Sequence, residues 1–176
     1  MKKLSVFALT LVATFALAMP SVGQELSRLE RQVRHELVML PFLSVFDNVE
    51  FQVSGSTVTL MGQVTRPSLK KSAERVVKNV EGVSTIKNEI EVLPTSSNDD
   101  RIRRAVARAI YSHPSFTRYS FQAVPSVHIV VKNGDVTLTG YVGTEADKNI
   151  AGIQANGVDG VFSVTNNLKV EGGNES

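Results

Sequence analysis

The stretch Val58-Thr59-Leu60-Met61-Gly62-Gln63-Val64 returns 78 positions later as Val136-Thr137-Leu138-Thr139-Gly140-Tyr141-Val142. The match continues at this offset without a gap over some 40 residues, of which roughly a third are identical. Upstream the offset becomes 73, so that Pro41 pairs with Pro114. We interpret the chain as two copies of one small domain, the second with about five extra residues before its first strand.

The repeat divides the 176 residues into two units of about 70 residues, each near the lower size limit for a self-sufficient core. The chain has no cysteine, which excludes disulfides, thiolate catalysis and cysteine zinc sites. We predict a first domain over 24–94, a linker over 95–100, a second domain over 101–172 and a frayed tail over 173–176. Residue 98, 99 or 100 is expected to cap the helix that begins near Arg101.

The N-terminus has the form of a secretory signal peptide. Lys2 and Lys3 precede an apolar run that ends at Ala18 and is too short for a membrane span. Small residues allow cleavage after Ala18 or after Gly23, and we favour the second site, which assigns 1–23 to the signal. An uncleaved N-terminal anchor is the alternative.

Removal of the signal would take away two lysines, leaving 17 basic residues (19 − 2) against 17 acidic ones. A mature chain without net charge argues against general polyanion binding by long-range attraction. Gly157-Val158-Asp159-Gly160 matches the Gly-x-x-Gly loop of KH domains, but it leads into a strand here, so we interpret it as a turn. No nucleic-acid partner is expected.

Hydrophobic periodicity predicts the same order of elements in both copies: helix, strand, strand, helix, strand. In the first copy we expect a helix over 26–40 stopped by Pro41, strands over 49–53 and 58–64, a helix from Pro67 ended by Gly82, and a strand over 86–92. In the second we expect a helix from 101 to about 112, strands over 127–131 and 136–142 joined by a type I′ turn at Asn133-Gly134, a helix over 145–156, and a final strand that buries Phe162 or Val164 with Leu168 and Val170.

This order predicts an α+β fold class with two tandem αββαβ domains. Each domain should be a three-stranded sheet with two helices on one face. The strand-helix-strand crossover should make the last strand parallel to the second, so that the sheet is mixed.

The repeated Val-x-Leu-x-Gly-x-Val, the later Val-x-Gly-Val and the Asn before an aliphatic strand end resemble the BON domain. The resemblance covers nearly the whole mature chain and implies a secreted protein similar to osmotically induced periplasmic proteins of Gram-negative bacteria. It implies phospholipid or envelope binding and stress protection, but this chain lacks the lipobox cysteine of lipid-anchored members. The matching positions are expected to be structural: Gly62, Gly140, Gly82, Gly160, Asn88 and Asn166.

Asn88 and Asn166 interrupt the apolar face of equivalent strands, where an unpaired amide costs about 1–3 kcal/mol. We expect each to tie down a neighbouring loop, with ligand contact as the alternative reading. Gly62 and Gly140 should lie where a side chain would obstruct helix packing or a bend.

The histidines, His35, His113 and His128, have no second ligand at a suitable spacing, so a surface or capping role is expected for each. No serine lies in a nucleophile elbow. The sequence therefore predicts a protein that is not an enzyme and that uses no cofactor or metal.

The segment from Arg101 to Arg108 is the most functional-looking stretch, with four arginines in eight residues. Arg101, Arg104 and Arg108 share one helix face by their spacing, and Tyr111 lies close to it. This face is a candidate for binding phosphates of an anionic surface. A solvated face is the alternative. The first copy's helix has mixed charge, so any anionic binding is expected on the second copy.

We therefore expect a non-enzymatic periplasmic module that associates peripherally with phospholipid or another envelope component. A soluble stress chaperone or protein-interaction adaptor, with a protein client, is the alternative.

Overall fold

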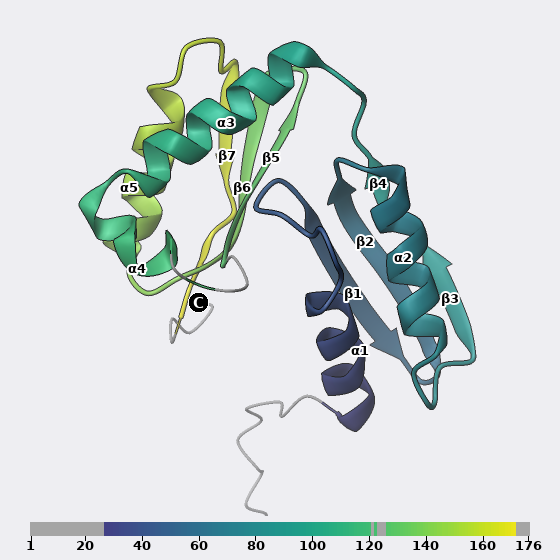
Figure 1. The fold of residues 1–176 in the computed structure, drawn as a ribbon. Helices are drawn as coiled ribbons and strands as arrows, with labels where there is room; N and C mark the ends of the chain where they lie inside the picture. The colour runs from purple at the N-terminus through teal and green to yellow at the C-terminus, as the bar shows by residue number, and fades with distance from the viewer. Residues whose placement is uncertain (1–26, 121, 123–125, 172–176) are drawn as a thin grey trace, which may run out of the picture.

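The computed structural model describes residues 27–120, 122 and 126–171. The predicted signal peptide and the tail from residue 173 lie outside the described residues. Two α+β units follow one another, and each packs its main helices on one face of its own sheet (Figure 1).

The first unit contains two helices and four short strands. They are α1 (Arg28–Val38), β1 (Asn48–Ser54), β2 (Thr57–Val64), α2 (Pro67–Lys78), β3 (Thr85–Asn88) and β4 (Glu91–Val92). β1 pairs antiparallel with β2, while β3 and β4 both pair parallel with β2. The mixed sheet is confirmed, but the predicted last strand is broken into two segments after Asn88.

The second unit repeats this topology and adds two short helices. Its elements are α3 (Ser97–Tyr111), η1 (Pro114–Phe116), α4 (Thr117–Ser120), β5 (Val127–Lys132), β6 (Asp135–Val142), α5 (Glu145–Asn156), β7 (Ser163–Asn166) and β8 (Lys169–Val170). β5 is antiparallel to β6, and β7 and β8 are parallel to it. The extra residues predicted from the change of offset accompany η1 and α4.

The structure moves two helix boundaries from the positions that the sequence predicts and confirms a third. α3 begins at Ser97, so 97–100 are helical rather than linker, and the cap is Ser96, whose hydroxyl accepts from the Asp99 amide at 3.2 Å. α2 ends at Lys78, ahead of Gly82. The predicted start at Pro67 is confirmed.

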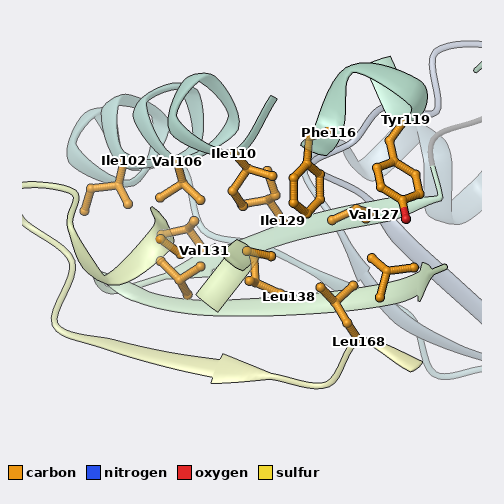
Figure 2. Close-up of a cluster of buried hydrophobic side chains, with 14 residues drawn as sticks. Ile102, Val106, Ile110, Phe116, Tyr119, Val127, Ile129, Val131, Leu138 and Leu168 are labelled. Atoms are coloured by element: carbon orange, nitrogen blue, oxygen red, sulfur yellow. The ribbon is translucent and has the colours of Figure 1, made fainter. Parts of the chain in front are cut away.

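Each unit has its own apolar core between helices and sheet. In the second unit Phe116 and Tyr119, from the extra helices, continue the row that Ile102, Val106 and Ile110 of α3 form above β5 (Figure 2). Phe162 is 86% exposed and the partly buried Val164 packs on the core, so Val164 is the residue of the two alternatives that the last strand turns inward.

The two units contact each other through the loop before β1 and the outer edge of β5 (Figure 1). The Val45 carbonyl accepts a hydrogen bond from the Ile129 amide at 2.7 Å. At the end of β5, Lys132 Nζ also lies 2.6 Å from Glu91 Oε1 of β4 in the first unit. Phe46 packs against the core of the second unit, so the contact combines a backbone bond, an ion pair and apolar burial.

Candidate anionic-surface site

Three arginines of α3 lie exposed on the side of the helix that faces away from the core. This arginine face consists of Arg101, Arg104 and Arg108, as their spacing predicts. The guanidinium groups of Arg104 and Arg108 have no hydrogen-bond or ion-pair partner among the residues that the structure describes. They are therefore two uncompensated cations that an anion from solvent can reach.

Arg101 is tied to the protein, unlike the other two arginines of the face. Its guanidinium donates to the Asp159 carbonyl at 3.2 Å and to Asn98 Oδ1 at 3.1 Å. A Cβ at residue 160 would overlap this guanidinium, and Gly160 has φ +88°. Residue 160 is therefore a glycine for two reasons: its φ is positive, and a side chain at this position would displace the guanidinium of Arg101.

The fourth arginine of the segment, Arg103, is 4% exposed and points toward the sheet. Its Nη2 donates to the Val131 carbonyl at 2.6 Å, and its Nη1 bonds to Asp100. Arg103 thus fixes α3 to β5 and does not contribute to the arginine face.

Tyr111 lies inward, which corrects the expectation that it sits at a headgroup boundary. Its hydroxyl donates to the Val127 carbonyl at 2.9 Å, and its ring packs edge-on against Phe116. Burial raises the pKa of Tyr111 to about 12. Its role here is to hold α3 against the start of β5.

The first copy has a related basic face, to which the comparison of helix charges in the two copies gave too little weight. At the offset of 73, Arg28, Arg31 and His35 occupy the positions of Arg101, Arg104 and Arg108, and all three are exposed. They line a groove of about 530 Å³ between α1 and α2. Two carboxylates line it too, and one of them, Glu81, lies 3.6 Å from Arg28.

Asn88 and Asn166 have equivalent structural bonds, each to the neighbouring segment between two short strands, as expected, and each to a helix as well. Asn88 Nδ2 donates to the Lys70 carbonyl of α2 at 3.0 Å, and its Oδ1 accepts from the Ile90 amide. Asn166 donates to the Lys148 carbonyl of α5 at 2.7 Å. Each amide thus joins a helix to the break in the last strand and stabilises that break.

Gly62 and Gly140 are required by the close approach of the neighbouring strand rather than by helix packing. Their φ angles are +104° and +107°. A Cβ would overlap the carbonyl oxygen of Asn48 in the first unit and of Ser126 in the second. Gly82 also has a positive φ, +96°, but only Leu29 Cδ1 at 3.7 Å lies near its missing Cβ.

The histidines differ in their surroundings. His35 is exposed, and His113 Nδ1 accepts from the Ser115 amide at 3.3 Å, which makes it a cap as expected. The surface-or-cap prediction is wrong for His128, which is partly buried beside Asp47 and Glu50 of the first unit. Burial lowers the pKa of His128, and the carbonyls of Asp47 and Ser44 act in the opposite direction.

A polar cluster around Asp147 escaped the sequence reasoning. Asp147 Oδ2 accepts from Tyr119 Oη at 3.0 Å and from Thr144 Oγ1 at 2.8 Å, and it pairs with Arg118. Burial favours a raised pKa for Asp147, but these bonds and the Arg118 charge outweigh it and hold the pKa below its usual value. The cluster secures α4 to the start of α5.

Among the described residues no group of three or more His, Cys, Asp or Glu side chains is arranged to hold a metal ion. No helix within the same residues is both long and apolar enough to cross a membrane.

A model of the BON domain family, described as "BON domain", matches residues 25–94 and 98–172. Both copies of the repeat are therefore matched, and together the two ranges cover most of the chain. The chain belongs to the BON domain family.

Among curated proteins, the chain is similar to osmotically-inducible protein Y of Escherichia coli (strain K12). The two are 30% identical over 126 residues, which cover 70% of this chain and 62% of that protein. The chain thus spans less than two thirds of the length of this relative.

Two solved structures of CdsD, a structural protein of the type III secretion system of Chlamydia trachomatis, are also similar. One, its C-terminal domain, has a TM-score of 0.30 at 13% identity and covers 83% of this chain and 98% of that chain. The other has a TM-score of 0.28 at 12% identity, with coverage of 78% and 90%.

Proposed function

We propose that the chain is a non-enzymatic binding module that acts in the periplasm. It associates with anionic phospholipid surfaces, or with another anionic envelope component, and supports the envelope under stress. The observation that carries this proposal is the pair of exposed cations, Arg104 and Arg108, without a carboxylate partner among the described residues. Membership of the BON family and the similarity to a protein named for osmotic induction support the stress-related part.

The chemistry of the arginine face suits phosphate. A guanidinium presents paired N–H donors that match two phosphate oxygens. Near an anionic membrane each basic residue contributes about 1 kcal/mol, and salt screens the attraction. Two free arginines provide weak, reversible and salt-dependent association, which is what a peripheral module requires.

Sedimentation with vesicles tests the proposal. The full mature chain should pellet with vesicles of anionic phosphatidylglycerol at low salt, should be released as salt rises, and should not pellet with zwitterionic vesicles. Absence of pelleting at low salt, where attraction is greatest, would contradict it.

A protein client is the second candidate, and it has its own observation. Ile153 on α5 is 67% exposed and Phe162 is 86% exposed, where the first copy has Arg75 and Ser84. Exposed apolar side chains of this kind suit contact with an unfolded client. Suppressed aggregation of a model client, lost in an I153S/F162S variant and unaffected by lipid, would favour this function.

A further inference from the structure

The loop after α1 presents two large apolar side chains to solvent. Met39 is 66% exposed and Phe42 is 77% exposed, and we call this pair the apolar tip. The residues that follow each of them, Leu40 and Leu43, pack into the core of the first unit. The loop therefore buries one set of apolar side chains and holds the other outside.

The base of the apolar tip is fixed by a buried carboxylate. Asp47 accepts from the Ser44 amide at 3.0 Å, from the Thr65 amide at 2.7 Å and from the Thr65 hydroxyl at 2.8 Å. This clamp ties the loop to the residues that precede α2. It brings the guanidinium of Arg66 to 6.0 Å from the centroid of the Phe42 ring.

The backbone at Phe42 is strained. Its φ is +68°, in the left-handed region that bulky side chains rarely adopt. The flanking leucines and the Asp47 clamp hold Phe42 in this conformation. Strain maintained to keep an aromatic side chain in water points to a use for that side chain outside the folded core.

The second copy shows that the fold does not require the tip. At the offset of 73, Ser112 and Ser115 stand in place of Met39 and Phe42. The inward position of Leu43 is instead kept apolar, as the fully buried Phe116. The apolar tip is thus a feature of the first unit alone.

We propose that the apolar tip inserts between the headgroups of a phospholipid surface, with Arg66 at the level of the phosphates. This rests on the proposed function and adds the site of insertion. A convex pair of side chains is far below the roughly 1,000 Å² that a specific protein interface buries. Apolar side chains beside a cation, in contrast, are the features by which peripheral proteins anchor at a bilayer interface.

Fluorescence tests the insertion, because the chain contains no tryptophan. The F42W variant then carries a single reporter, and F162W places the same reporter at an exposed aromatic outside the tip. On phosphatidylglycerol vesicles F42W emission should shift to the blue and be quenched by brominated acyl chains, whereas F162W emission should not change.

A second variant measures the contribution of the tip. M39S/F42S gives the first unit the serines of the second copy, and burial of two such side chains predicts a loss of vesicle affinity of about tenfold or more. I153S/F162S removes two exposed apolar side chains elsewhere and should retain the wild-type affinity. Because all four positions are exposed, circular dichroism should show both variants folded.

The outcomes separate the two proposals. If the wild type pellets with vesicles but F42W emission does not shift, the insertion proposal is wrong and the proposed function stands. If the wild type does not pellet, both are wrong. If F42W responds to an unfolded protein client and not to vesicles, the tip binds protein and the insertion proposal is overturned.

Discussion

Asp147 makes side-chain bonds that the sequence repeat does not predict. Its partners Arg118 and Tyr119 belong to α4, which accompanies the extra residues of the second copy and has no counterpart in the first. No spacing rule joins these residues to Asp147, so only the folded structure brings them together. The same holds for Asp99, whose carboxylate accepts from the amides of the Asn133-Gly134 turn.

Asp147→Asn should destabilise the second unit by about 1–3 kcal/mol, because bonds to a buried carboxylate are lost. Since the folded state lowers the pKa of Asp147, its stabilising contribution is present above the unfolded value of about 3.9 and is lost as the pH falls through the folded value. Urea unfolding of the variant at neutral and acidic pH measures both effects. Asp159→Asn, at an exposed position, is the control, and equal unfolding free energies for the two variants would contradict the account.

At the scale of elements, much of the fold could be predicted, because periodicity and the duplication report on the same architecture. The start of α2 at Pro67, the bounds of α5 and the Asn133-Gly134 turn, with φ of +55° and +84°, agree with the sequence. The break in the last strand could not be predicted, because it is stabilised by hydrogen bonds from Asn88 and Asn166 to helices that are distant in the sequence.

Pairing of β1 with β2 depends on Gly62. Gly62→Ala should cost about 2–4 kcal/mol, since it adds an overlap with the Asn48 carbonyl to the strain of a positive φ. Gly82→Ala carries the strain without the overlap and should cost less, about 1 kcal/mol. Thermal and urea unfolding compare the two, and a Gly82→Ala variant that is the less stable one would refute the close-approach explanation.

At the scale of the whole molecule, no sequence motif predicted how the two units meet. β5 presents His128 and the 5% exposed Val130 on the face opposite its core residues. The groups that face the imidazole are Asp47 and Glu50, with the carbonyl of Ser44, all from the first unit. His128 Nδ1 has no hydrogen-bond partner among the residues that the structure describes. The contact is therefore built around a histidine whose pKa is lowered by burial.

This arrangement predicts a pH dependence of stability. Because burial lowers the folded pKa of His128, the stability from its neutral form is complete above the unfolded pKa of about 6.5 and is lost as the pH falls below it. Unfolding free energy should therefore fall between neutral pH and about pH 5.5, and His128→Gln should flatten this slope. The exposed His35→Gln should keep the slope, and a slope unchanged in His128→Gln would refute the assignment to this imidazole.

The sequence predicts an arginine face of three residues. The structure reduces the number of free cations on this face from three to two. Arg101 is engaged by the 157–160 turn and Tyr111 is turned inward, so the face that solvent can reach with free cations is that of Arg104 and Arg108. No residue spacing distinguishes these cases, because the partners come from distant elements.

The measurement that tests the central claim most directly is the salt dependence of binding to phosphatidylglycerol vesicles for R104Q/R108Q. At about 1 kcal/mol for each arginine, the variant should bind roughly 30-fold more weakly than wild type at low salt, with a shallower dependence on salt and an unchanged melting temperature. K87Q/K169Q removes two charges from exposed strand positions and should bind like wild type. If R104Q/R108Q binds as tightly as wild type, the arginine face is a solvated helix surface and the claim is contradicted.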